Sequence, residues 1–422
     1  MAAKKAEKEK VIRVANVGLG ARGCGMMTRF ARTLKNVQVV AVCDLYEDRA
    51  EKGREAAQQL QPDIKVDAYT DYKKIIGRDD IDAVVVTTSW DDHVRIAAEA
   101  MYSGKYAGIE CGGGGSVNEC QKLVRAYEQT GKWCMSLENC CYDRKELALL
   151  RMIREGVFGE LTHFEGGYLH DLRDEIAHGI ENRHYRHDNY VHRCADFYPG
   201  HALGPIMKFA DINRGNRLVT LTSFASKAAG LHEYCKNENP SSADANRRWL
   251  EGDVVQTFIR CAHGETILMT HDTSSPRGYS RGLKVQGSRG IYSEESGSLY
   301  LDNKGEVSGQ SFSSCLASDR WGHPLYDWYE KQNVGDPGGH GPMDWMVISA
   351  FIEAIRRGIE PPIDTYDTAT LLCVTALSEE SCALGGQTLP IPDFTDGKWI
   401  NRSPAPASVF SLDRIDKELY EM

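Results

Sequence analysis

The sequence predicts two parts: an α/β domain built on a parallel sheet, followed by an α+β domain with a largely antiparallel, open sheet. Residues 11–137 alternate β-branched runs with helical patterns, which is the order of parallel βαβ units. Beyond residue 138, short strand-like runs follow one another across short connections, as in an antiparallel sheet. A chain of 422 residues is long enough for two or three domains.

The first strand and the turn after it, residues 14–23, carry the glycine pattern GxGxxG. In such a turn one glycine bends the chain, one admits a diphosphate, and one lets the next helix pack against the strand. That helix is expected to begin near Cys24, and a second strand over 37–43 ends at Asp44, which can bind a ribose diol. We therefore predict a Rossmann domain that binds NAD rather than NADP. The expected contacts are Gly18, Gly20, Ala21, Arg22, Gly23 and Asp44. The alternative is an ordinary glycine-rich loop.

Later strands of this domain also end in residues that suit a binding site. A helix over 47–60 and an apolar run over 83–88 continue the alternation, and a strand over 106–110 precedes four consecutive glycines at 112–115. Carboxyl ends of parallel strands meet at one edge of the sheet, where ligands bind. The residues expected at that edge are Trp90, His93, Glu110, Cys111, Gly112 and Gly113. The alternatives are a tryptophan that packs on its own helix (93–104) and a flexible glycine hinge.

Residues 170–201 are rich in aromatic and histidine side chains. A metal site is one interpretation, but the segment lacks HExxH or another tight ligand spacing, so we expect no metal. A polar pocket of the size of a sugar fits these side chains better. His201 is expected just before a helix that has Pro205 in its first turn. The positive end of the helix dipole would favour a neutral imidazole there, ready to accept a proton.

The rest of the chain supplies the predicted second sheet and its helices. Helices are expected over 144–155, 343–357 and 365–384, and strands over 133–137, 161–169, 218–224, 254–261, 266–271, 282–286 and 290–292. The Rossmann domain is expected to end at residue 137. Residues 138–422 then form a domain for substrate binding and oligomerisation, because an open sheet with an exposed apolar face needs a cover. We therefore expect a homo-oligomer.

Composition excludes several classes of protein. The net charge of -10 opposes binding to nucleic acid, and no apolar run approaches the roughly 18 residues of a membrane span. The thirteen cysteines lack a CxxC pair, so neither a disulfide framework nor a structural zinc is indicated. Residues 1–10 are charged and predict a disordered tail. The sequence as given predicts a cytoplasmic protein; the alternative is a periplasmic or secreted protein whose leader was removed.

A Rossmann domain followed by an antiparallel-sheet domain resembles the Gfo/Idh/MocA oxidoreductases. Within that group the chain resembles the NAD-dependent α-N-acetylgalactosaminidases of glycoside hydrolase family 109. The resemblance rests on ENCCY at 138–142, YLHDLR at 168–173, YPGHALGP at 198–205 and DTSSPRGYS at 272–280. Dehydrogenases of the wider group follow the strand-end Glu with Lys-Pro, whereas Cys111 and Gly112 stand here. This departure disfavours a simple sugar dehydrogenase, although the four-glycine loop also exceeds what the glycosidases show.

The resemblance implies a redox-neutral glycosidase. NAD would oxidise C3 of the sugar, the aglycone would leave by elimination, water would add, and C3 would be reduced again. His201, supported by Tyr198, would accept the hydroxyl proton, and Tyr168, or alternatively His170, would remove the proton from C2. The residues expected to hold the small-molecule or glycan substrate are Glu138, Arg186 and Tyr279. The alternatives are a sugar or inositol dehydrogenase with net oxidation, and a non-catalytic protein that binds sugar and NAD.

Overall fold

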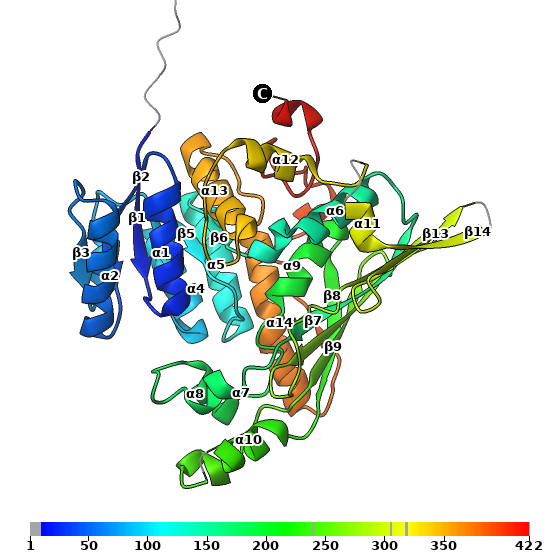
Figure 1. The fold of residues 1–422 in the computed structure, drawn as a ribbon, viewed down its shortest axis with the longest axis horizontal. Coiled ribbons are helices and arrows are strands. Elements are labelled where there is room, and N and C mark those ends of the chain that lie inside the picture. The colour runs from blue at the N-terminus through cyan, green and yellow to red at the C-terminus, as the bar shows by residue number, and fades with distance from the viewer. Residues whose placement is uncertain (1–9, 239, 304–305, 317–319, 422) are drawn as a thin grey trace, which may run out of the picture.

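The structure is a computed structural model that describes residues 10–238, 240–303, 306–316 and 320–421. Residues 1–9 of the predicted disordered tail lie outside the described residues. The described chain contains a six-stranded and a nine-stranded sheet. Figure 1 shows the two sheets side by side, with α13 and α14 between them. The predicted fold class is confirmed.

The six-stranded sheet is parallel throughout, in the order β3-β2-β1-β4-β5-β6. Its strands are β1 (Ile12–Val17), β2 (Val37–Cys43), β3 (Asp67–Tyr69), β4 (Ala83–Val86), β5 (Tyr106–Ile109) and β6 (Cys134–Ser136). The helices between them are α1 (Ala21–Thr33), α2 (Glu47–Leu60), α3 (Lys73–Ile76), α4 (Trp90–Tyr102) and α5 (Val117–Thr130). The chain reverses its direction of winding between β1 and β4, the place where doubly wound sheets bind their ligands.

Two helices of this domain begin earlier than the sequence predicts. Helix α1 begins at Ala21 rather than near Cys24, because Gly20 is extended and already serves as the N-cap. Helix α4 begins at Trp90, so Trp90 and His93 lie in its first turn and not in a loop before it. Helix α5 has Ser116 as its N-cap, and the Ser116 hydroxyl accepts a hydrogen bond from the backbone N–H of Glu119.

The nine-stranded sheet runs in the order β14-β13-β12-β11-β7-β10-β9-β8-β15 and is antiparallel except for the central pair of β7 and β10. Its strands are β7 (Leu161–Leu169), β8 (Leu218–Ala225), β9 (Val255–Cys261), β10 (Thr266–Asp272), β11 (Lys284–Gly287), β12 (Gly290–Ser293), β13 (Ser298–Asn303), β14 (Glu306–Ser311) and β15 (Leu389–Pro390). Sequence patterns indicated β7 to β12, and missed the hairpin of β13 and β14.

The second half of the chain also contains helical segments. They are η1 (Asn139–Tyr142), α6 (Arg144–Arg154), α7 (Arg173–Ala177), α8 (Arg186–His192), α9 (Gly200–Phe209), α10 (Gly230–Glu238), η2 (Ala243–Asn246), α11 (Phe312–Leu316), α12 (Pro324–Lys331), α13 (Pro342–Arg357), α14 (Thr365–Ala383), η3 (Lys398–Ile400) and η4 (Lys417–Tyr420). No helix among the described residues is both long and apolar enough to cross a membrane.

The histidine-rich segment and α9 differ from the prediction. Residues 170–201 contain α7 and α8 rather than one loop. Helix α9 begins at Gly200, so His201 lies within its first turn and Pro205 lies inside the helix. Proline has no N–H, so the carbonyl of His201 receives no α-helical bond from position 205. His201 is nevertheless at the positive end of the helix, as expected.

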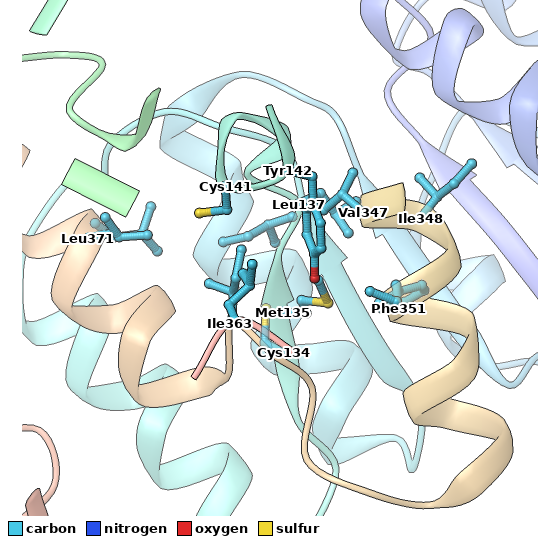
Figure 2. Close-up of a cluster of buried hydrophobic side chains, with 14 of the residues drawn as sticks. Cys134, Met135, Leu137, Cys141, Tyr142, Val347, Ile348, Phe351, Ile363 and Leu371 are labelled. Atoms are coloured by element: carbon cyan, nitrogen blue, oxygen red, sulfur yellow. The ribbon is translucent and has the colours of Figure 1, made fainter. Parts of the chain in front are cut away.

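The last two long helices return to the first domain and fix the end of its sheet. Figure 2 shows Met135 and Leu137, on and just after β6, in a buried cluster with Val347 and Phe351 of α13. Helix α14 packs on α5 and β6, and also on β8 of the second sheet. Threonine hydroxyls of α14 accept hydrogen bonds from the N–H groups of the edge strand β6, at 2.9 Å and 2.8 Å. The position of Glu138, which follows β6, is therefore set by both halves of the chain.

Candidate active site

A cavity of about 1130 Å³ lies at the carboxyl ends of the parallel strands and is bounded by both halves of the chain. Its first wall is the glycine turn with Asp44, and its second wall comes from the segment 168–201. The predicted site residues that line it are Gly18, Gly20, Ala21, Arg22, Gly23, Asp44, His93, Glu110, Cys111, Tyr168, Arg186, Tyr198 and His201. The folding of the chain thus brings most of the predicted cofactor and substrate residues to one space.

The glycine turn is shaped as the pattern predicts. Gly18 has φ +96°, and a Cβ there would lie 2.5 Å from the backbone of Thr87. At Gly23 a Cβ would lie 2.1 Å from the carbonyl oxygen of Gly18, so only glycine lets α1 pack this close. A Cβ at Gly20 would meet no atom within 4 Å, and this residue faces the cavity beside the N-terminus of α1. The turn therefore has the open backbone that a dinucleotide diphosphate requires.

Asp44 is held against this turn. Its carboxylate accepts hydrogen bonds from the backbone N–H of Leu19, at 2.7 Å, and of Tyr46, at 3.0 Å. Asp44 also lines the cavity, so it lies where a ribose diol would reach its free lone pairs. Together with the open face of Gly20, this arrangement fits NAD.

Arg22 is engaged with carboxylates of both domains. Its guanidinium donates to Glu110 at 2.9 Å and to the two oxygens of Asp344 at 2.8 Å and 3.0 Å. Burial opposes the charge of Arg22, but Glu110 and Asp344 outweigh it and raise the pKa of Arg22. Asp344, on α13, is fully buried and also accepts from the side chain of Asn139 at 2.7 Å and the backbone N–H of His340 at 3.1 Å.

Sequence reasoning missed this junction. Asp344 had no local signal because it belongs to the first turn of a helix more than 300 residues away from Arg22. Asn139 and His340 line the cavity, and neither was predicted as a site residue. Asn139 could have been found, since it directly follows Glu138 at the end of β6.

Glu138 and His201 form a hydrogen-bonded pair at the cavity. Nδ1 of His201 lies 2.8 Å from Oε1 of Glu138, whose side chain is fully buried. Burial alone would raise the pKa of Glu138, but the charge and hydrogen bond of His201 outweigh burial and lower it to about 2. An ionised carboxylate only accepts hydrogen bonds, so the Nδ1 atom of His201 that faces it carries a proton and donates the bond, and Nε2 is the second nitrogen of the ring.

Tyr168 and Tyr198 pack beside this pair. The ring centroids of the two tyrosines are 4.5 Å apart, and His201 lies 5.5 Å from Tyr168 and 4.8 Å from Tyr198. The Tyr168 hydroxyl contacts Nδ1 of His170 at 3.2 Å. Burial raises the pKa of Tyr168 to about 12, and burial together with the charge of Arg186 lowers the pKa of His170. At neutral pH a neutral phenol is thus in hydrogen-bond contact with a neutral imidazole.

Arg186 and Tyr279 approach the same cluster from two sides. The Arg186 guanidinium lies 5.6 Å from the ring centroid of Tyr198 and pairs with Glu175. The Tyr279 ring lies 5.2 Å from that of His170, and its side chain is half exposed. Its hydroxyl accepts a hydrogen bond at 3.3 Å from Arg281, which is buried and paired with Glu146 at 2.6 Å.

Some predicted residues are not among those that line the cavity: Trp90, Gly112, Gly113, Glu138, His170 and Tyr279. Trp90 is buried and stacks on Phe197 with the centroids 5.4 Å apart. The glycines allow close packing between protein segments, because a Cβ at Gly112 would meet Trp90 at 2.1 Å and one at Gly113 would meet Thr375 at 1.9 Å. Contact of these residues with the cofactor stays a prediction.

His93 lines the cavity from the first turn of α4. Its Nε2 lies 3.1 Å from the backbone oxygen of Thr88, and burial lowers its pKa to about 4. In a neutral imidazole the single N–H then lies on Nε2 and is donated to Thr88, so Nδ1 is left as a buried acceptor, and His93 is suited to binding rather than to proton transfer at neutral pH.

The fold and this site define an NAD-binding protein of the Gfo/Idh/MocA class. The family model described as "Oxidoreductase family, NAD-binding Rossmann fold" matches residues 12–137. The model described as "Glycosyl hydrolase 109, C-terminal domain" matches residues 142–401, which is more than half of the chain. The chain therefore belongs to glycoside hydrolase family 109, and it is an NAD-dependent glycoside hydrolase.

Curated relatives support this membership over nearly the whole chain. A glycosyl hydrolase family 109 protein of Stenotrophomonas maltophilia (strain K279a) is 35% identical over 430 residues, which cover 95% of this chain and 92% of the relative. An alpha-N-acetylgalactosaminidase of Tannerella forsythia is 34% identical over 425 residues, which cover 94% of this chain and 89% of the relative.

Solved structures share the fold at low identity. The myo-inositol 2-dehydrogenase of Lactobacillus plantarum has a TM-score of 0.61 at 16% identity, covering 91% of this chain and all of that chain. A levoglucosan dehydrogenase in complex with NADH has a TM-score of 0.63 at 17% identity, and the match covers 90% of this chain and 99% of that chain. The predicted architecture is thereby confirmed, and the match to the NAD-binding family model over residues 12–137 confirms the NAD cofactor.

Proposed function

We propose that this enzyme cleaves α-linked N-acetylgalactosaminides through transient oxidation at C3, elimination of the aglycone, addition of water and re-reduction. The observation that carries the proposal is the cluster of Glu138, His201, Tyr168 and His170 at the cavity that the cofactor turn also lines. The sugar is suggested by the name of the Tannerella forsythia relative. Cysteine at position 111, in place of the dehydrogenase lysine, also supports a route other than net oxidation.

His201 is the proposed base for the C3 hydroxyl. Nδ1 of its ring is held by the Glu138 carboxylate, which leaves Nε2 to accept the hydroxyl proton, and the carboxylate then stabilises the imidazolium. Tyr198, packed against the ring, supports its orientation. NAD, when bound, takes up the two electrons released at C3 and later returns them. Gly18, Gly20, Gly23 and Asp44 are proposed to hold it.

Tyr168 is the proposed base at C2, with His170 as the alternative. A neutral phenol is a weak base, so Tyr168 accepts the C2 proton as its own proton passes to Nδ1 of His170, 3.2 Å away. The C1–O bond then breaks and the aglycone oxygen leaves with the electron pair. Water adds to C1 while a proton returns to C2, so the cycle consumes only water. Arg186, Tyr279 and Glu138 are proposed to orient the sugar.

The test is hydrolysis of an α-linked N-acetylgalactosaminide in deuterated water without added NAD. We expect free sugar that carries solvent deuterium at C2, and enzyme that purifies with NAD bound. A product without deuterium at C2 would reject the elimination route. NADH formed in proportion to free sugar would indicate the net dehydrogenase, and binding of sugar and NAD without turnover would indicate the non-catalytic protein.

We also propose the division of the chain and its assembly. A cofactor domain over 11–137 and a substrate and oligomerisation domain over 138–422 are supported by the boundary between the two matched family models. A homo-oligomer is supported by apolar side chains on the outer face of the second sheet, where Phe224 of β8 and Phe258 of β9 are 61% and 48% exposed. Light scattering should give more than one protomer, and Phe258→Asp should lower that mass.

A further inference from the structure

Three side chains of types that serve as ligands for transition metals lie close together at the wall of the cavity. Cys111 follows β5, Glu138 follows β6, and His201 lies in the first turn of α9. One donor atom from each, a sulfur, a carboxylate oxygen and an imidazole nitrogen, lies within 4.8 Å of the other two. Cys111 and Glu138 are buried, and the His201 side chain is 13% exposed. Residues from three distant parts of the sequence thus form a compact set of donors.

A second observation points to a cation. The Oε2 atom of Glu138 is buried and has no hydrogen-bond partner in the described structure. The buried Cys111 thiol contacts the carbonyl oxygen of Leu137 at 3.8 Å and also hydrogen-bonds to the side chain of Glu138, which places the sulfur against the same carboxylate. A buried carboxylate oxygen without a partner is costly, and a bound cation would satisfy it.

The arrangement suits a metal with one open coordination position. Zinc binds sulfur at about 2.3 Å and nitrogen or oxygen at about 2.0–2.2 Å, so tetrahedral ligands lie roughly 3.3–3.8 Å apart. The three donor atoms would have to move by about 1 Å to reach the spacing of tetrahedral zinc ligands. Side chains commonly move by this much when a ligand binds. Cys111 and His201 both line the cavity, so the fourth position opens to it.

The charge around the three residues also favours a cation. Glu110 lies next to Cys111 and accepts a hydrogen bond from its backbone N–H at 3.1 Å. The positive group nearest in this network, Arg22, is bound to the carboxylates of Glu110 and Asp344. Thiolate and imidazole ligands select zinc, cobalt or cadmium rather than magnesium or calcium.

We propose that Cys111, Glu138 and His201 form a reversible inhibitory site for a thiophilic divalent cation such as Zn²⁺. The thiol proton leaves to solvent as the sulfur binds the metal, the ring nitrogen of His201 that binds the metal gives up any proton that it carries, and water completes the coordination. The bound ion would take His201 and Glu138 out of proton transfer and would occupy the position of the sugar. The inhibition rests on the proposed function, whereas the binding does not.

The test uses Co²⁺ as a probe on the purified NAD-containing enzyme. A cysteine ligand gives a sulfur-to-cobalt charge-transfer band in the near ultraviolet, and we expect one band per protomer that Zn²⁺ abolishes by displacement. Cys111→Ser should remove the band and weaken Co²⁺ binding by at least about tenfold. Cys24→Ser is the matched control, because the Cys24 thiol contacts only the carbonyl of Leu19 among the hydrogen bonds of the described residues. It should retain the band.

Further variants keep the proposal open to refutation if Cys111→Ser folds poorly. Glu138→Gln should also weaken Co²⁺ binding, and circular dichroism reports whether each variant is folded. The site is refuted if the Cys111 variant keeps the band, or if binding depends instead on the exposed His192 and Asp188 pair. Co²⁺ binding without inhibition of hydrolysis would refute the inhibitory role. An enzyme without glycosidase activity that still shows the band would refute the proposed function alone.

Discussion

Replacement of Glu138 by glutamine removes one charge from the centre of the site and keeps the shape of the side chain. The amide oxygen can still accept a hydrogen bond from Nδ1 of His201, now 2.8 Å from the carboxylate, but it cannot stabilise an imidazolium. Because general acid–base catalysis contributes about 10²–10⁴-fold, we expect kcat to fall by at least about 10²-fold. We expect NAD to stay bound, since the residues proposed to hold it are Gly18, Gly20, Gly23 and Asp44 and do not include Glu138.

The same carboxylate contributes to stability in a way that depends on pH. Its pKa is lowered from 4.5 to about 2 in the folded protein, since the interactions with His201 outweigh burial. At 1.36 kcal/mol per pH unit, this difference corresponds to about 3 kcal/mol of folding free energy. Because the pKa of Glu138 is lower in the folded than in the unfolded protein, its ionisation stabilises the fold at pH values above the unfolded pKa. This stabilisation is lost as the pH falls, so the free energy of unfolding decreases by about 1.4 kcal/mol between pH 6 and pH 3.5.

Two assays check this reasoning. Steady-state hydrolysis gives kcat for the wild type and Glu138→Gln, and urea unfolding at pH 6 and pH 3.5 gives the free energy of unfolding of each. The difference between the two proteins should shrink by about 1.4 kcal/mol at the lower pH. Glu55→Gln on the exposed face of α2 is the control and should change neither quantity. A kcat within twofold of the wild type would refute the proposed role of the carboxylate.

Three other substitutions separate binding from folding. Gly20→Ala places a Cβ in open space at the cavity, so we expect weaker NAD binding in a fluorescence titration and an unchanged Tm. Gly113→Ala places a Cβ 1.9 Å from the Thr375 hydroxyl, so Tm should fall with a loss of about 1–3 kcal/mol; an unchanged Tm would contradict the packing argument. Lys208→Met leaves the buried carboxylate of Asp367 without its partner at 2.7 Å, and urea unfolding should report a loss of about 3–5 kcal/mol.

The sequence located the cofactor turn because local rules act there. Gly18 and Gly23 are needed for steric reasons within a few residues, and the strand over 37–43 ends at Asp44 as the pattern predicts. The start of α1 was misplaced by three residues, since Gly20 was not identified as the N-cap. The roles of the predicted catalytic residues stay predictions, although the structure brings His201, Tyr198 and Tyr168 together.

Sequence patterns did not predict the contacts between residues that are far apart in the chain. The pairing of Arg22 with Asp344 joins positions that are 322 residues apart, and no periodicity links them. The four glycines at 112–115 illustrate the same limit. Their composition indicated a close approach, but the packing of Gly113 against Thr375 of α14 depends on where the last helix returns.

The amino-acid sequence by itself determined the two-part architecture, the NAD-binding turn and the family resemblance, because glycine sterics, apolar periodicity and motif identity are local properties. Only the tertiary structure decided which residues meet. It placed Glu138 against His201 and brought Cys111 to both, since the carboxyl ends of β5 and β6 and the first turn of α9 converge on one cavity wall. The physical reason is that charge coupling and donor geometry depend on distance in space, which sequence separation does not encode.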